Sequence, residues 1–246
     1  MQTHDTPAAA AASAPAAALA RLAPILRSLT DNKQQLGFRY AQWCTGAPTL
    51  EAATAATAMA QAELGHSRAL LPVLDELAEF LPADALGDER TVIAFAALDR
   101  PFASWAEFVA ANVALDGAMT ALIESALATP FAPFQTRTRK MVDEERYHAV
   151  HGMGWVQKLA RLSPESAAEL GAALERCWPE ALAWFGPDGG DIDQLRADGL
   201  LADSAAELRA KLAGRCAAAF AQLGLSAEAA PDWARWDAAT RRLGAA

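Results

Sequence analysis

The 246-residue sequence has few of the residues on which several common kinds of site depend. Its three cysteines are far apart and form no Cys-x-x-Cys pair, which argues against a disulfide framework or a zinc–thiolate site. They are expected to be free, buried thiols in a reducing compartment. The sequence has no glycine-rich phosphate loop, no Gly-x-Ser-x-Gly motif and no convincing Ser/His/Asp order, so nucleophilic hydrolysis is not supported.

Positive charge and long apolar runs are also scarce. Twenty-one basic residues against thirty acidic ones give a formal charge of −9, which disfavours nucleic acid or an anionic membrane as a partner. No stretch approaches the roughly 18 consecutive apolar residues that a membrane span needs. The N-terminus lacks the positively charged start of a signal peptide. We therefore predict a cytoplasmic protein whose partners are proteins and small molecules.

Alternation of β-branched residues is nearly absent, whereas apolar residues recur at spacings of three and four, so the predicted fold class is all-α. Residues 1–20 are predicted to be a disordered, alanine-rich tail, and residues 21–246 a single helical domain. Long helices are expected at about 22–44, after Thr49 with a kink at Pro72, from "SWAE" to near "ATPFAP", and at about 134–162. Shorter ones follow: one opening at "SPES" and ending near the "WFGPDGGD" loop, one at about 204–223, and one around "WARWDAATRRL". This order predicts a four-helix bundle with additional C-terminal helices.

Two of the predicted helices carry a Glu-x-x-His pair in the middle of a buried stripe. The stripes, stepped by four and three, are Ala52, Ala56, Met59, Glu63, His66 and Leu70, and Thr138, Met141, Glu145, His148, Gly152 and Trp155. A buried, unpaired carboxylate is costly, so each pair needs a compensating partner. Residues three apart on a helix can converge on one point, and carboxylate plus imidazole suits iron, manganese or zinc.

The other two long helices each carry one polar residue at the corresponding place in their stripes. In the third helix this residue is Asp116, which lies 29 positions before Glu145. In the first helix it is Lys33, 30 positions before Glu63, where a carboxylate-bridged dinuclear site would need an acid. The predicted metal ligands are therefore Glu63, His66, Asp116, Glu145 and His148.

Three further features have simpler interpretations. His151 is expected beside the site or on the surface rather than among the ligands. Glu144 is expected on the outer face, with the alternative that it replaces Glu145 in a shifted helix. The seven tryptophans are expected to be packing anchors rather than a cofactor site.

Four segments, "APTLEAATAATAMAQAELGH", "SWAEFVAANVALDGA", "EERYH" and "WPEALAWFGPDGGD", resemble in order and spacing the phenylacetic-acid catabolic family of ferritin-like proteins. The likeness covers roughly residues 25–190. The best-known members of that family are the catalytic and structural subunits of the multicomponent phenylacetyl-CoA epoxidase. The resemblance implies a ferritin-like bundle and, in the catalytic type, an oxygen-activating di-iron centre that epoxidises an aromatic CoA thioester with electrons from a separate reductase.

The resemblance leaves the role of the chain open, because Lys33 stands where the family pattern has a glutamate. The leading interpretation is an O2-dependent iron oxygenase in aromatic or aryl-CoA catabolism, whose possible partners are a reductase and a homologous subunit, in a homo- or hetero-oligomer. The cofactor would be one or two iron ions, or manganese. One tightly held ion beside a weaker or vacant position is the working hypothesis, with Lys33 as a proton donor or a substitute ligand. The alternatives are a non-catalytic structural subunit, in which Lys33 bridges leftover carboxylates, and a protein that stores iron or carries oxygen.

Overall fold

The computed structural model describes residues 16–79, 81, 91–227 and 230–244, and most of these residues are helical. The helices are α2 (Ala16–Ala41), α3 (Leu50–Ala78), α4 (Trp105–Ala111), the π-helix η2 (Asn112–Asp116), α5 (Gly117–Ser125), α6 (Ala132–Leu162), α7 (Pro164–Ala183), α8 (Asp191–Ala197) and α9 (Ala205–Gln222). Two short 3₁₀ turns, η1 (Ala96–Leu98) and η3 (Trp233–Arg235), and a hairpin of β1 (Trp236–Asp237) and β2 (Arg242–Leu243) complete the described elements. The all-α prediction is confirmed.

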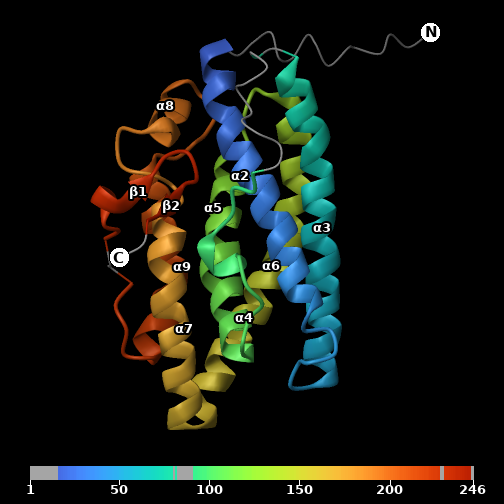
Figure 1. Cartoon of the computed structure of the whole chain (residues 1–246), viewed down its shortest axis with the longest axis vertical. Helices are drawn as coiled ribbons and strands as arrows, with labels where there is room; N and C mark the ends of the chain where they lie inside the picture. The colour runs from blue at the N-terminus through green and yellow to red at the C-terminus, as the bar shows by residue number, and fades with distance from the viewer. Residues whose placement is uncertain (1–15, 80, 82–90, 228–229, 245–246) are drawn as a thin grey trace, which may run out of the picture.

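Four long helical segments form the bundle: α2, α3, the continuous run α4–η2–α5, and α6 (Figure 1). The segments α2 and α3 pack against each other as a hairpin, and α6 packs against both α3 and α5. The C-terminal elements α7, α8, α9 and the hairpin lie on one side of the bundle, and α3 lies at the opposite edge (Figure 1). This arrangement confirms the ferritin-like bundle with a C-terminal helical appendage.

Side-chain caps fix where several of these helices begin. The hydroxyl groups of Thr49, Ser104, Ser163 and Ser204 each accept a hydrogen bond from a backbone N–H in the first turn of the following helix. Ser204 and Glu207 form a complete capping box. Pro72 lies inside α3 without ending it.

The structure differs from the sequence-based boundaries in three places. The first helix begins at Ala16, inside the predicted tail, because Ala18 and Leu19 are buried against the bundle; residues 1–15 of that tail lie outside the described residues. The predicted loop contains the start of α8 at Asp191. The predicted helix around residues 233–243 is wrong: β1 and β2 pair as a hairpin, Arg241 in its turn has a φ of 53°, and Arg241 Nε donates a hydrogen bond to the Trp184 carbonyl that anchors the hairpin.

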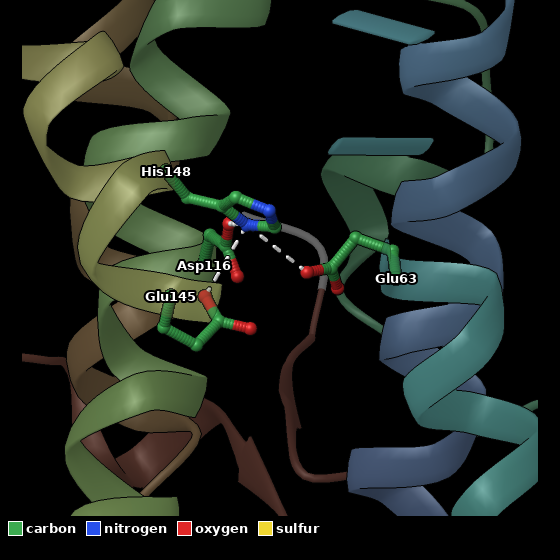
Figure 2. Close-up of side chains that lie close together, drawn as sticks. All are labelled: Glu63, Asp116, Glu145 and His148. Carbon is green, nitrogen blue, oxygen red and sulfur yellow. Dashed lines mark hydrogen bonds and ion pairs between the residues drawn. The ribbon is translucent and has the colours of Figure 1, made fainter. Parts of the chain in front are cut away.

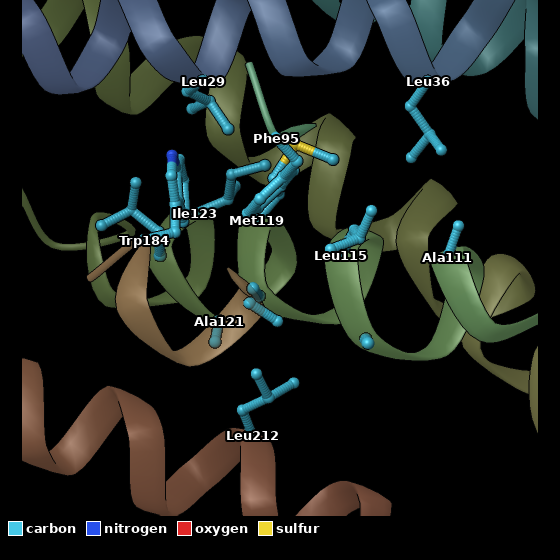
Figure 3. Packing of buried hydrophobic residues seen from close by; sticks show 14 of the residues in the cluster. Leu29, Leu36, Phe95, Ala111, Leu115, Met119, Ala121, Ile123, Trp184 and Leu212 are labelled. Atoms are coloured by element: carbon cyan, nitrogen blue, oxygen red, sulfur yellow. The ribbon is translucent and has the colours of Figure 1, made fainter. Parts of the chain in front are cut away.

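The hydrophobic core is centred on the α4–η2–α5 segment, which α2, α6 and α9 surround (Figure 3). The span Trp105–Ser125 is long and apolar enough to cross a membrane by length and composition alone, but 83% of its most apolar window is buried inside the bundle. This segment is therefore the central core helix of the fold. Its buried position also places Asp116 in the middle of the bundle.

Candidate functional site: a buried cluster of carboxylates, histidines and one lysine

The polar residues that the sequence predicts to face inward meet at one point in the bundle, and Figure 2 shows four of them, Glu63, Asp116, Glu145 and His148. The α2 helix supplies Lys33, α3 supplies Glu63 and His66, η2 supplies Asp116, and α6 supplies Glu145 and His148. Lys33 and Glu63 are completely inaccessible to solvent, and the other four are at most 4% exposed. The helical stripes therefore predicted the inward direction of all six side chains.

The ammonium group of Lys33 lies among the three carboxylates. Its Nζ donates hydrogen bonds to Glu63 Oε1 at 3.0 Å, Asp116 Oδ1 at 2.8 Å and Glu145 Oε1 at 2.5 Å. An ammonium has three N–H donors and here has one carboxylate acceptor for each of them. Lys33 is thus fully hydrogen-bonded, and it links three different helices to α2.

His148 contacts the same three carboxylates through Nδ1. The distances are 3.0 Å to Asp116 Oδ2, 3.3 Å to Glu63 Oε1 and 3.4 Å to Glu145 Oε2. No described residue accepts a hydrogen bond from its other ring nitrogen, Nε2. The cluster therefore holds this imidazole through Nδ1, and the described residues leave Nε2 able to bind another group.

His66 is bound differently, although its pair has the same spacing on α3. Its Nδ1 lies 3.2 Å from Glu145 Oε1 and 3.8 Å from Glu63 Oε1. Its Nε2 lies 2.6 Å from Glu144 Oε2, on a half-exposed carboxylate of α6. Glu144 is half-exposed, but it has a partner at the cluster, and it does not replace Glu145. It contacts the imidazole from the solvent side, a role that the sequence analysis missed.

Three further side chains hold Asp116 and Glu145 in place. The Tyr40 hydroxyl donates to Asp116 Oδ2 at 3.3 Å and accepts from Asn112 Nδ2 at 3.2 Å. The Thr120 hydroxyl lies 3.0 Å from Glu145 Oε2. These contacts hold the carboxylates in place without a bound ligand.

A π-helical turn positions Asn112 and Asp116. All five residues of η2 are buried, and a π-helical turn of this kind is frequent at functional sites. Gly152 on α6 faces this turn, and a Cβ atom there would lie 1.9 Å from Asn112 Oδ1. Asn112 therefore occupies its place only because residue 152 has no side chain.

The mutual contacts determine the protonation of the cluster. Burial lowers the pKa of Lys33, but Asp116, Glu145 and Glu63 outweigh it and raise that pKa well above its usual value. Burial also opposes the charge on His148, yet hydrogen bonds to the carboxylates raise its pKa to about 12. Burial and the neighbouring Asp116 raise the pKa of Glu63 to about 7, despite Lys33.

Two further groups complete the charge balance. Burial favours the neutral form of Glu145, but the Lys33 charge and hydrogen bonds from both histidines hold its pKa well below the usual value. The pKa of His66 is lowered by burial but raised overall by its contact with Glu145. Three carboxylates thus face one ammonium and two imidazoles that favour protonation, so this cluster can reach neutrality from its own side chains.

The cluster contains a donor set able to hold a metal ion. Glu63, Asp116, Glu145 and His148 each offer one ligand atom, and these atoms all lie within 4.8 Å of one another. However, an ion would need carboxylate oxygens at about 2.0–2.2 Å, and the Lys33 ammonium already bonds one oxygen of each carboxylate. With Lys33 in this position the residues do not fit a metal centre, and α2 places no fourth acid at the cluster as the sixth ligand of a dinuclear one.

A pocket of about 670 Å³ opens beside the cluster between α3 and α6. Its lining includes His66, Glu144 and His148 from the cluster region and the basic residues Arg137 and Lys140 of α6. His151 also lines this pocket but does not contact the carboxylates; it packs near Trp105 and Trp155. The expectation that His151 is not a member of the inner group agrees with this geometry.

A helical bundle with two inward Glu-x-x-His pairs and an inward aspartate belongs to the ferritin-like class of proteins. The chain belongs to the phenylacetic acid catabolic protein family, whose sequence profile matches residues 1–242. It is 27% identical over 178 residues to one of the subunits of the 1,2-phenylacetyl-CoA epoxidase of Escherichia coli K12, covering 71% of each chain. It is 29% identical over 156 residues to another of the subunits of that enzyme, covering 59% of this chain and 48% of the relative. The chain is therefore a ferritin-like protein of phenylacetate catabolism.

Proposed function

We propose that this chain is a non-catalytic, metal-free subunit of a multicomponent oxygenase of the phenylacetyl-CoA epoxidase type, acting in the cytoplasm. The observation that carries the proposal is the position of Lys33 Nζ, within 3.0 Å of one oxygen of each of the three buried carboxylates. A cation inside this cage is needed because three buried carboxylates cannot remain uncompensated. Lys33 supplies that cation permanently. The comparisons support a role in an assembly, because both relatives are named as subunits of an epoxidase.

A metal-dependent oxygenase for an aromatic or acyl-CoA substrate, served by a separate reductase, is the second candidate. Two observations favour it: the four clustered ligand atoms, and Glu63 Oε2, which is buried without a hydrogen-bond partner in the described part of the chain. The adjacent pocket has the size of a small-molecule site. For an ion to bind, the Lys33 ammonium would have to leave the carboxylates or lose its proton, whereas its contacts hold its pKa high.

Metal analysis of the full chain separates the two candidates. We expect protein purified from iron-replete medium to retain less than about 0.1 iron or manganese ion per chain, and its melting temperature to be unchanged by EDTA. The variant Lys33→Glu removes the ammonium and adds the missing acid, so it should bind iron(II) and gain thermal stability on doing so. One or two ions held tightly by the wild type, with a melting temperature that falls in EDTA and recovers with iron, would contradict the proposal even if Lys33→Glu did not fold.

A further inference from the structure

The outer surface between α3 and α6 is hollowed along much of its length. The pocket of about 670 Å³ continues past His151 into a second hollow of about 400 Å³ near Thr49 and Lys158. We call the two hollows together the α3–α6 groove. All of their described lining residues belong to α3, its N-cap Thr49, or α6. On α6 the lining runs from Thr136 to Lys158, about 33 Å of helix at 1.5 Å per residue.

The α3 wall of the groove consists mainly of small, uncharged residues. Between Glu51 and Arg68, the only ionisable residues of α3 are Glu63 and His66, and both are buried in the cluster. The residues that α3 contributes to the large pocket are mostly alanine and glycine: Ala55, Ala58, Met59, Gln61, Ala62, Gly65, His66 and Ala69. A wall of this kind allows the backbone of another helix to approach closely.

Large apolar side chains are exposed beside the same groove. Tyr147 in the first hollow and Val150 in the second are 78% and 74% exposed. Leu50, which is 80% exposed, begins α3 between two residues that line the second hollow. The C-terminal helices lie on the side of the bundle opposite to α3 (Figure 1), and the exposed fractions show that they leave these residues uncovered. Exposed apolar residues along a groove are typical of a protein-binding surface.

The polar groups of the groove select the charge of the partner. Three basic residues, Arg137, Lys140 and Lys158, line it against two acidic ones, Glu51 and Glu144, in a chain whose net charge is −9. Glu144 is bound to His66 and lies 3.6 Å from the Lys140 ammonium, and Arg137 lies 3.8 Å from Glu76, so Lys158 is the basic residue with no acidic side chain within ion-pair distance in the described part of the chain. His148, which is only 4% exposed, lines the groove with its unpaired Nε2, and His151 has a buried Nε2 without a partner among the described residues. Among the described residues, no acceptor is provided for His148 Nε2.

We infer that the α3–α6 groove binds an amphipathic helix of a partner protein, with small apolar residues against α3 and acidic residues against α6. This is helix-in-groove recognition, in which apolar anchors recur at three and four residues and flanking charges set the orientation. The inference rests on the proposed function, because a non-catalytic subunit exerts its effect through its partners. It does not depend on the metal content of the cluster, so the two proposals fail separately.

The test uses two stapled, fluorescein-labelled 21-residue helices with the same leucine and alanine face, one flanked by glutamates and one by lysines. Anisotropy titrations with the full chain should show the acidic helix binding at least about ten-fold more tightly than the basic one. Ala58→Arg, at an exposed position of the α3 wall, should weaken binding of the acidic helix about ten-fold or more. Ala217→Arg, at an exposed position of α9, is the matched control and should leave binding unchanged. The double variant Lys140→Glu/Lys158→Glu should reverse the preference between the helices.

Four results would overturn the inference. Equal affinity for the two helices, or binding that Ala58→Arg does not change, would show that the groove does not select an acidic helix. A wild-type dimer in light scattering that Ala58→Arg converts to a monomer would assign the groove to a second copy of this chain. Coenzyme A binding that is lost in Ala58→Arg and excludes both helices would make the groove a small-molecule site.

Discussion

The two Glu-x-x-His pairs have the same spacing, but the structure places them in different surroundings. On α6, His148 Nδ1 contacts three buried carboxylates. On α3, His66 divides its contacts between the cluster and the half-exposed Glu144. The difference arises on the facing helices, because η2 offers Asp116 to His148 whereas α6 offers Glu144 to His66. The spacing along a helix sets the direction of a side chain, and the residues of the neighbouring helix determine which groups it contacts.

The largest effect is expected from removing the cation that the two pairs share. Lys33→Met leaves three buried carboxylates without their ammonium and should lower the free energy of unfolding by about 3–5 kcal/mol. Denaturant unfolding followed by circular dichroism measures this loss. Lys140→Met, at an exposed lysine, is the control and should change stability by less than about 0.5 kcal/mol. A Lys33→Met protein as stable as the wild type would mean that Lys33 does not compensate the cluster.

The comparison of the two histidines can be made directly. His148→Gln removes the group that contacts three carboxylates and should cost about 2–4 kcal/mol. His66→Gln should cost about 1 kcal/mol, because its second partner, Glu144, remains partly hydrated. Parallel unfolding titrations give the difference. Equal costs would show that the two pairs are energetically equivalent despite their different contacts.

The π-helical turn provides a test of how Asp116 is positioned. Gly152→Ala places a methyl group against the Asn112 side chain and should cost about 1–3 kcal/mol. Gly154→Ala on the same helix meets nothing within 4 Å and should be neutral or stabilising by up to about 1 kcal/mol. Adding Asn112→Ala to Gly152→Ala should recover part of the loss, and purely additive effects would contradict the proposed contact.

The smallest expected effect is a gradual dependence of stability on pH. Because the pKa of His148 rises from 6.5 to about 12 on folding, its contribution is complete below pH 6.5 and declines as the pH rises above that value. The raised pKa of Glu63, about 7, acts in the same direction between pH 4.5 and 7. The lowered pKa of Glu145 acts in the opposite direction, but only as the pH falls below 4.5.

The free energy of unfolding should therefore fall by about 1 kcal/mol per pH unit between pH 7 and 9. Guanidinium titrations at pH 7, 8 and 9 measure this slope. His148→Gln should have a clearly smaller slope than the wild type. An identical slope in the two proteins would show that the imidazole is not protonated in the folded state.

Much of the fold and of the cluster could be predicted from the sequence, because both depend on helical periodicity. The stripes placed Lys33, Glu63 and Asp116 at buried positions, and the structure buries all three. The caps at Thr49 and Ser204 marked helix starts that the structure also has. Local sequence patterns are enough to predict a feature that depends only on the direction in which a side chain leaves its own helix.

The remaining features depend on contacts between distant segments. The pairing of Glu144 with His66 joins α6 to α3, and nothing in the local spacing of "EERYH" indicates it. The sequence of the π-helical turn has the pattern of an ordinary helix. The space for the Asn112 side chain comes from α6, where Gly152 has no side chain. The C-terminal hairpin likewise depends on Arg241 reaching a carbonyl 57 positions away.

The fully enclosed Lys33 has a consequence for how the bundle is made in the cell. A resident metal ion has to be acquired after translation, in competition with other ions and with the iron supply of the cell. An ammonium that belongs to the polypeptide is present at one per chain when synthesis ends, and zinc, copper or iron starvation does not change that number. It also carries no redox chemistry that would damage the surrounding side chains. On the proposed function, the bundle would therefore mature without a metallation step.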